Sequence, residues 1–335
     1  MTRVMPDERK IYADLYACAK GNWDIYIPFM ELSMKLGQVV ALITPDKWLS
    51  KPFGLEFRKR YMVSRLNIIT HAGASVFKNA TVDAIVSLFV KSSKVIKGCK
   101  FIKENDVQTL TYANIKSIQD PYYIDFVFST QSSLITKLDS YPLKLKDLEV
   151  ICEGACATSD AYKVVPLLKD NTIPIVDQST TYKLVNTGTI VKYASLWGKK
   201  PITYLGNKPL FPVINKVDFE KTLGRTYIQR AQRPKIIFKG LNLLDAFIDI
   251  SAEFIPGKTT LVICSEDTDK LKFLCAIINS KLIFKYIKIK YQSSSYCGGI
   301  TFTSDMINLL PLPTSNILRD RIVNVVNLIL AAKQS

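Results

Sequence analysis

In the N-terminal region the apolar residues are spaced first as in a helix and then as in a strand. This order of helix and strand occurs twice. Apolar spacing within residues 22–36 predicts a helix whose buried face carries Ile25, Phe29, Leu32 and Leu36. Residues 39–45 (VVALITP) are apolar without alternation, which predicts a strand buried on both faces. Residues 52–62 then predict a second helix, and residues 64–73 a second strand.

The stretch ASVFKNATVDAIVSLF (residues 74–89) combines a strand with an exposed aromatic. Val82–Phe89 is apolar on both faces, which predicts a third buried strand. Phe77 stands beside Lys78 and Asn79, where a turn would lift its ring out of the core. It is either a core residue at the end of the sheet or a side chain held out for a ligand. Helices alternating with three strands predict an α/β fold forming one flank of a larger sheet.

The rest of the chain has a different pattern. Residues 92–140 are irregular, with a strand or hairpin expected in DPYYIDFVFST. Short strand-like runs then predict a second, mixed α/β unit: residues 183–193, 201–206, 233–240 and 259–267. A helix over residues 268–288 follows. The last helix is expected to pack through Leu318, Ile322, Val325 and Ile329.

Charge adds a candidate ligand class to this picture. The 335-residue chain is long enough for about two domains and carries a net charge of +16. Residues 199–239 contain ten Lys or Arg but only two acidic residues, Asp218 and Glu220. Such a local excess indicates a surface for a polyanion, although a solvated lysine-rich surface would give the same composition.

Motifs for autonomous chemistry are missing from the sequence. The seven cysteines have no paired spacing, which is typical of reduced thiols in a cytoplasmic protein. With His71 as the single histidine, neither a zinc site nor a histidine-based catalytic triad is expected, so no metal is predicted. The glycines form no G-x-G pair and no P-loop, and no apolar run is long enough to span a membrane.

The order of the motifs resembles a known family. DIYIPFMELSMKL, GQVVALITPDKWL, LEFRKRY and VFKNATVDAIVSLF resemble the part of TaqI-like, gamma-class adenine-N6 DNA methyltransferases that follows their catalytic motif. LEVICEGACATSDAYKV, QRPKIIFKG, TTLVICSED, LKFLCAIINSKLIFKYIK and SYCGGITFTSDMINLLPLP resemble the C-terminal specificity domain of that family. The resemblance implies the C-terminal half of a Rossmann-like methyltransferase sheet in residues 1–130. A TaqI-like target-recognition domain would follow in residues 131–335.

One departure from the family limits the expected activity. The family's S-adenosylmethionine loop, its acidic ribose contact and its Asn-Pro-Pro-Tyr motif would all lie upstream of Tyr12, and the chain has no Pro-Pro pair. The resemblance therefore implies S-adenosylmethionine for the complete enzyme but no cofactor or catalytic residue on this chain alone. The chain is expected to come from a truncated gene, to be a fragment made for expression, or to be one subunit of a split enzyme of a restriction–modification system.

The resemblance also assigns roles to residues, with duplex DNA as the partner. Phe77 would stack on an adenine flipped out of the helix. Phosphate contacts are expected from Lys199, Lys200, Arg230, Arg233, Lys235 and Lys239, and the two arginines could instead read guanine. Tyr296, Gly298 and Gly299 mark a loop that could approach DNA closely or form an ordinary turn. The alternatives are a methyltransferase subunit active with a partner, or a basic α/β module that binds RNA or protein.

Overall fold

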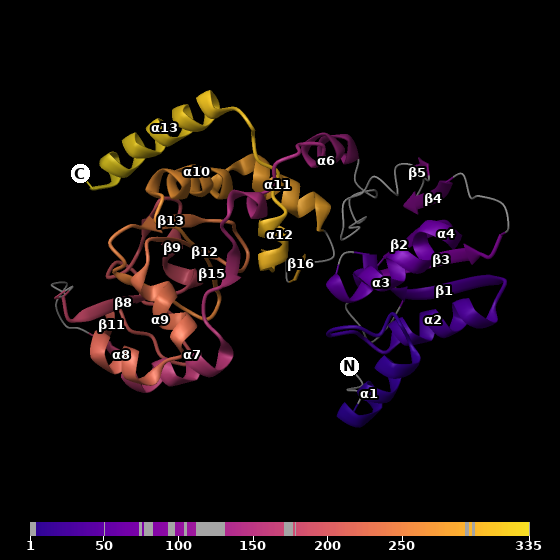
Figure 1. Ribbon diagram of the computed structural model, residues 1–335, viewed down its shortest axis with the longest axis horizontal. Helices are drawn as coiled ribbons and strands as arrows, with labels where there is room; N and C mark the ends of the chain where they lie inside the picture. The colour runs from indigo at the N-terminus through magenta and orange to yellow at the C-terminus, as the bar shows by residue number, and fades with distance from the viewer. Residues whose placement is uncertain are drawn as a thin grey trace. The chain divides into compact units, whose positions relative to one another are not determined.

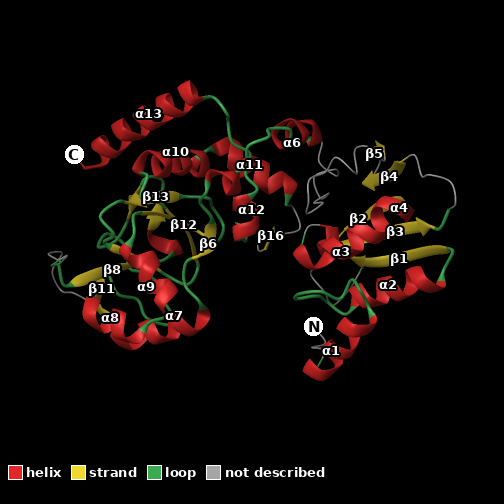
Figure 2. Cartoon of the chain, in the orientation of Figure 1, coloured by secondary structure: helices red, strands yellow, loops and turns green. Residues whose placement is uncertain are grey.

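The computed structural model describes residues 5–49, 51–73, 76, 83–92, 98–103, 106–111, 131–170, 177, 179–291, 295–296 and 299–334. The chain forms two compact units, one of residues 1–137 with 288–294 and one of residues 138–287 with 295–335 (Figure 1). Both units mix helices and strands (Figure 2). None of the described helices is long and apolar enough to cross a membrane.

Unit 1 is built on a five-stranded sheet in the order β1-β3-β2-β4-β5. The strands are β1 (Val39–Pro45), β2 (Leu66–Gly73), β3 (Ala84–Val90), β4 (Gly98–Lys103) and β5 (Asp106–Thr111). Its helices are α1 (Pro6–Leu15) and α2 (Tyr26–Leu36). Short helical turns lead from β1 to β2: η1 (Asp46–Leu49), η2 (Pro52–Gly54), α3 (Leu55–Phe57), η3 (Arg58–Met62) and α4 (Val63–Arg65).

The third predicted strand lies between the first two. β3 is antiparallel to both β1 and β2, so β1 and β2 run in the same direction. β2 pairs with β4 in parallel, and β4 and β5 form a hairpin. The sequence prediction missed this hairpin, because within residues 92–140 it expected a strand or hairpin only in residues 120–130. The strand expected in residues 120–130 lies outside the described residues.

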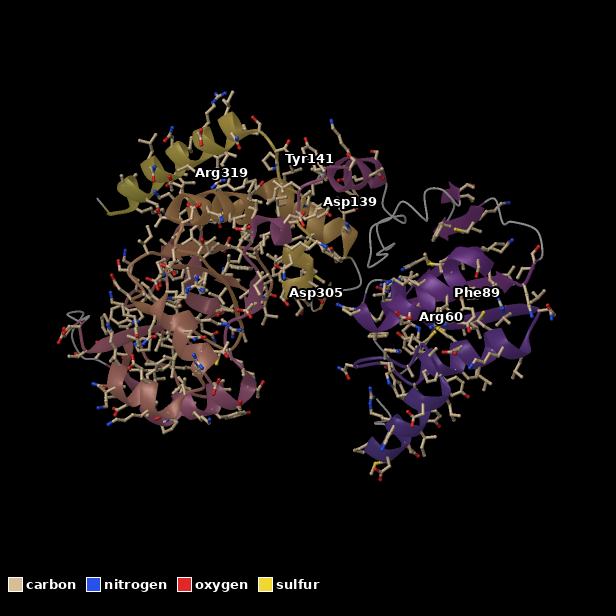
Figure 3. All side chains as sticks on the ribbon, viewed as in Figure 1. Arg60, Phe89, Asp139, Tyr141, Asp305 and Arg319 are labelled. Atoms are coloured by element: carbon tan, nitrogen blue, oxygen red, sulfur yellow. The ribbon has the colours of Figure 1, made fainter. Side chains whose placement is uncertain are left out.

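The two faces of this sheet are buried to different extents. On β3 Ile85, Ser87 and Phe89 (labelled in Figure 3) are buried on one face, whereas on the other face only Ala84, at the start of the strand, is buried. The centres of the Phe89 and Phe57 rings lie 5.7 Å apart. The opposite face carries Ile43 and Val86, which are paired across β1 and β3 and are 47% and 39% exposed. The prediction that β1 and β3 are buried on both faces was therefore wrong for this chain.

The apolar faces predicted for two helices were also wrong. α2 buries Ile27, Met30 and Met34, whereas Phe29 and Leu36 of the predicted face are 58% and 78% exposed. Glu31 fixes this orientation, because its carboxylate accepts hydrogen bonds from the backbone N–H groups of Ala17 and Cys18. The C-terminal helix α13 (Asn316–Gln334) is likewise rotated from its predicted orientation. It buries Val323 and Val326 and exposes two residues of the predicted face, Leu318 and Val325.

Unit 2 contains two four-stranded sheets, ordered β14-β8-β11-β7 and β13-β12-β15-β6. The strands are β6 (Cys152–Gly154), β7 (Lys169–Asp170), β8 (Thr181–Val185), β11 (Pro212–Asn215), β12 (Lys235–Lys239), β13 (Ala246–Asp249), β14 (Phe254–Pro256) and β15 (Thr260–Cys264). The pairs β9 (Ile190–Val191) with β10 (Ala194–Ser195), and β16 (Ser295–Tyr296) with β17 (Gly299–Ile300), are separate.

The other helical elements begin with α6 (Ser132–Asp139), η5 (Leu145–Leu148), α7 (Thr158–Val164), η6 (Val165–Leu167) and η7 (Thr187–Thr189). They continue with α8 (Lys216–Thr222), α9 (Arg225–Gln232), α10 (Thr268–Asn279), α11 (Lys281–Lys290) and α12 (Ser304–Asn308). The strands predicted in residues 233–240 and 259–267 are β12 and β15. Residues 201–206 instead contain only an isolated bridge, between Tyr204 and Asn207.

The helix predicted over residues 268–288 is two helices separated by Ser280. Asn279 ends α10, and its buried side-chain amide bonds both the N–H and the carbonyl of Ala246. The Ser280 hydroxyl then accepts a hydrogen bond from the N–H of Leu282 and begins α11. Apolar periodicity runs through this junction, so the pattern alone did not reveal the break.

Candidate nucleic-acid interface

Phe77 and Gly298 lie outside the described residues, so their assigned roles stay predictions. The strands that flank Phe77 are described. β1 and β2 end at Pro45 and Gly73, and both of these residues are paired with Ala84, the first residue of β3. The segment that carries Phe77 therefore connects β2 to β3 at the side of the sheet where β1 and β2 have their carboxyl ends. Ligands of open α/β sheets bind just outside the carboxyl ends of the strands.

Buried polar contacts support the backbone at this edge. The Asp46 N–H donates to the carbonyl of Asp83, which joins the end of β1 to the start of β3. The Trp48 indole donates to the Thr44 hydroxyl at 3.1 Å. Arg58 is fully buried and donates to the carbonyls of Trp48 and Lys51. These contacts give the edge a fixed backbone, which a ligand-binding loop requires.

The basic stretch of residues 199–239 separates into free and paired cations. Lys199 and Lys200 are exposed, after the chain turns back at the Leu196 carbonyl. The other four predicted phosphate ligands each have a carboxylate partner. The pairs are Arg230–Glu153, Arg233–Glu266, Lys235–Asp249 and Lys239–Asp245. A large part of the positive charge is therefore neutralised within the fold.

Lys235 is a correction to the sequence prediction. Its side chain is fully buried and lies 2.7 Å from the Asp249 carboxylate. Its ammonium also donates to the carbonyls of Ala231 and Arg233. Burial lowers the pKa of Lys235, and the Asp249 charge opposes that effect. Lys235 holds α9 against β12 and β13 and cannot reach a phosphate in this fold.

Arg230 also has a structural use for its guanidinium. Two of its nitrogens lie 2.9 Å and 3.1 Å from the Glu153 carboxylate, and a third donates to the carbonyl of Gly154. Such a fork is the geometry that reads guanine, and here Glu153 occupies it. Arg233 differs, because its pair with Glu266 is half exposed and weak enough to be exchanged for a phosphate.

The segment predicted to approach DNA closely is placed beside a loop that sequence reasoning missed. Tyr296 and Gly299 pair in the β16–β17 hairpin. The carbonyl of Ile300 in this hairpin accepts the Asn242 N–H at 2.8 Å, and Phe302 donates to the Gly240 carbonyl at 2.9 Å. The loop of residues 240–245 thus lies against residues 300–302. No motif marks this loop, although its Gly-x-Asn order indicates a turn.

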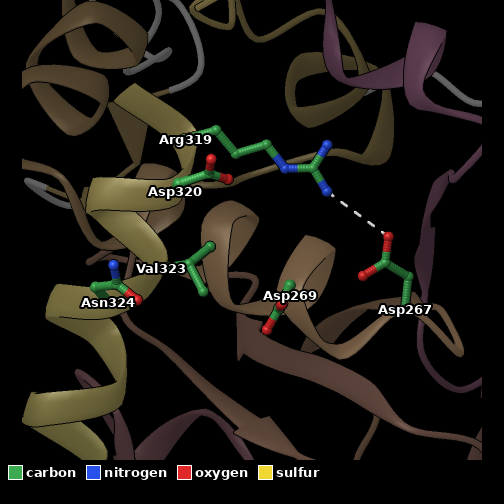
Figure 4. A pocket seen from close by; sticks show the side chains of 6 residues that line it. All are labelled: Asp267, Asp269, Arg319, Asp320, Val323 and Asn324. Atoms are coloured by element: carbon green, nitrogen blue, oxygen red, sulfur yellow. Dashed lines mark ion pairs between the residues drawn. The ribbon is translucent and has the colours of Figure 1, made fainter. Parts of the chain in front are cut away.

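A pocket of about 370 Å³ in unit 2 does not suit a phosphate. It lies between α10 and α13, and Figure 4 shows the side chains that line it. Three of these are carboxylates, from Asp267, Asp269 and Asp320. Arg319 is paired with Asp267 at 3.6 Å. An acidic lining repels polyanions, so this pocket lies outside the candidate interface.

Comparisons with known proteins relate the chain to restriction–modification enzymes. Residues 2–77 match a family described as Eco57I restriction-modification methylase. No curated protein matches the chain. Among solved structures, the type IIL restriction-modification enzyme MmeI in complex with DNA is 11% identical, with a TM-score of 0.51, over 99% of this chain and 48% of MmeI.

Two further solved structures have lower TM-scores. The type IIG restriction endonuclease BpuSI is 10% identical with a TM-score of 0.38, over 98% of this chain and 48% of BpuSI. The ATP-dependent type ISP enzyme LlaBIII bound to DNA is 8% identical with a TM-score of 0.46, over 99% of this chain and 28% of LlaBIII. The chain thus spans about half or less of these proteins. Residues 2–77 are thus similar to a restriction–modification methylase family, and the fold of the chain is similar to that of a restriction–modification enzyme.

Proposed function

We propose that this chain is the DNA-recognition portion of a site-specific adenine-N6 methyltransferase of a restriction–modification system. The observation that carries this proposal is the extent of one structural match. Both units of the chain correspond to parts of MmeI, which was solved with DNA, and residues 2–77 match a methylase family. In this proposal unit 1 is the flank of the methyltransferase sheet, and unit 2 recognises the target sequence.

The cofactor of the complete enzyme would be S-adenosylmethionine, and the residues of this chain do not fit it. The sequence has no G-x-G loop and no Pro-Pro pair of an Asn-Pro-Pro-Tyr motif. We therefore derive no methyl-transfer step from this chain. Its part in the reaction is to bind duplex DNA and to hold the target base.

Holding the base requires stacking. Extruding an adenine from the duplex costs a few kcal/mol. An aromatic ring stacked on the extruded base stabilises it by about 1–3 kcal/mol, which offsets part of that cost. Phe77 is proposed for this role, since it belongs to the connection between the ends of β2 and β3. Lys199, Lys200 and Arg233 are proposed to contact phosphates, because their side chains are exposed.

A binding titration tests the proposal. The chain is expected to bind a fluorescent DNA duplex with an affinity that falls steeply between about 50 and about 200 mM salt. A duplex with one unpaired adenine should bind more tightly, because its base is already out of the stack. The Phe77→Ala variant should lose this preference and keep its affinity for the paired duplex. Absence of salt-sensitive duplex binding would contradict the proposed function. An equal loss of affinity for both duplexes in Phe77→Ala would instead indicate that Phe77 packs in the core.

A second candidate function is that of a subunit of a split methyltransferase. The outer strand β1 of the sheet in unit 1 favours it. Within the described residues β1 pairs only with β3, so its other edge is unpaired. Val39 and Ile43 on β1 are 64% and 47% exposed. An apolar strand at a free edge is a template for another strand. The proposed partner would contribute that strand together with the cofactor and catalytic motifs.

A further inference from the structure

Helix α11 presents an exposed basic face. Lys281 and Lys285 are one turn apart and both exposed, and Lys288 continues the same face. Ile283, Tyr286 and Ile287 on the opposite face are buried. The sequence of α11, KLIFKYIKIK, contains no carboxylate. Within the described residues no ion pair is found for Lys281 or Lys285, in contrast to the paired cations of residues 230–239.

A rigid turn in the loop of residues 240–245 projects beside this helix. Asn242 has a positive φ of 68° and is the central residue of a γ-turn, because the Leu243 N–H donates to the Leu241 carbonyl at 3.0 Å. Leu241 and Leu243 on either side are 36% and 51% exposed. The turn therefore presents one amide between two apolar side chains to the solvent.

The base of this turn is closed by polar contacts. Lys239 and Asp245 form an ion pair at 2.7 Å, and the Lys239 N–H donates to the Asp245 carbonyl at 3.0 Å. Gly240 donates to the Thr259 carbonyl at 3.0 Å, and a Cβ at Gly240 would come within 2.7 Å of the same oxygen. The turn thus has little freedom to change its conformation. Such preorganisation lowers the entropy lost when a ligand binds.

Two contacts tie this turn to α11. Phe284 on α11 lies 6.4 Å from Phe302, whose N–H donates to the Gly240 carbonyl. Asn279, which ends α10 and is separated from α11 only by Ser280, bonds both backbone groups of Ala246 at 2.9 Å and 3.0 Å. Lys281, Lys285 and the turn are therefore held on packed elements of unit 2, and together they form one candidate surface.

We propose that this surface contacts duplex DNA, with Lys281 and Lys285 on phosphates and Asn242 on a base edge in the major groove. The inference rests on the proposed function and assigns residues to it. Lysines supply affinity and fix the register, while base contacts supply specificity. Asn is suited to adenine, because its amide can bond N6 and N7 together. Leu241 and Leu243 provide apolar contacts of the kind that thymine methyl groups accept.

Duplex DNA is the occupant that the geometry favours over duplex RNA. The Asn242 side chain is short, so it can reach a base edge only if the backbone of the turn enters the groove. The groove must therefore be wide. The major groove of B-DNA is about 12 Å wide and admits protein elements. That of A-form RNA is deep and narrow, and side chains cannot read it.

The test compares two variants of the full chain with one control on a pool of duplexes of randomised sequence. Lys281→Gln with Lys285→Gln should make the slope of log affinity against log salt less steep by about 1.8, at about 0.9 for each phosphate contact. It should keep the sequences that the wild-type chain selects. Asn242→Gly keeps the positive φ available and removes the amide. It should leave the salt slope unchanged and lose the preference at one base pair of the selected sequence.

The control removes the same charge elsewhere on unit 2. Lys163 on α7 and Lys169 on β7 are exposed and lie outside residues 199–239, and α7 lies away from α11 (Figure 1). Lys163→Gln with Lys169→Gln should leave the slope nearly as in the wild-type chain. Equal slopes for the two double variants would overturn the phosphate role of α11, and an unchanged selected sequence in Asn242→Gly would overturn base reading. Absence of duplex binding by the wild-type chain would instead defeat the proposed function itself.

Discussion

Lys235 illustrates how the fold changes the meaning of a charged residue. In the sequence it is one cation of a basic stretch, and in the structure it is the buried partner of Asp249. The Asp249 carboxylate also accepts the N–H groups of Glu253 and Phe254, each at 3.0 Å. Removing the lysine would leave these bonds in place, but the negative charge would be buried without a counter-ion.

We therefore expect Lys235→Met to destabilise unit 2 by about 3–5 kcal/mol. Arg233→Met is the matched control, since its pair with Glu266 is exposed and should contribute at most about 1 kcal/mol. Scanning calorimetry, which can separate the transitions of the two units, would measure both changes. Similar small losses in the two variants would mean that the buried pair contributes no more than a surface pair.

The sequence predicts the parts of the candidate site that follow from local signals, and not the parts that depend on partners distant in sequence. The exposed Lys199 and Lys200 follow a turn that Gly198 indicates. The partners of Arg230 and Lys235 could not be predicted, because Glu153 and Asp249 are distant in sequence and no local pattern links them. Asn242 was missed for a similar reason, since hydrogen bonds to residues beyond position 299 define its surroundings.

At the scale of elements, uniform apolar runs predicted strands well and predicted buried faces badly. β12 and β15 lie within the predicted runs, since continuous β-branched residues have few alternatives to a strand. α2 and α13 bury other faces than expected. Each helix has apolar residues on more than one side, so periodicity alone does not choose the buried side.

The free edge of β1 leads to a prediction about association. Ile43 is exposed on this strand, whose second edge is unpaired within the part of the chain that the structure describes, and edges of this kind favour pairing with a second chain. Without its proposed partner the wild-type chain should self-associate, and Ile43→Lys should shift it to monomer. Ile11→Lys, at an exposed apolar residue of α1, is the control and should behave as the wild-type chain. Sedimentation velocity over a range of concentrations measures this, and a monomeric wild-type chain would contradict the prediction.

At the scale of the whole molecule, the net charge of +16 guarantees some affinity for any polyanion. Charge therefore cannot separate a DNA-recognition protein from a general basic module. Shape can separate them, because both kinds of duplex offer phosphates but only B-DNA offers a readable major groove. The distinction therefore depends on the turn at Asn242, because the α11 lysines are proposed to contact phosphates, which both duplexes carry.

Competition between duplexes measures this distinction. An unlabelled DNA duplex should displace a bound DNA probe at a concentration at least about fivefold lower than an RNA duplex of the same sequence, since one good base contact alone contributes about 1–3 kcal/mol. The advantage should shrink in Asn242→Gly, because the remaining phosphate contacts are common to both duplexes. If RNA competed as well as DNA at every salt concentration, the surface would be a polyanion site without groove recognition. The chain would then be better described as a basic α/β module than as a target-recognition protein.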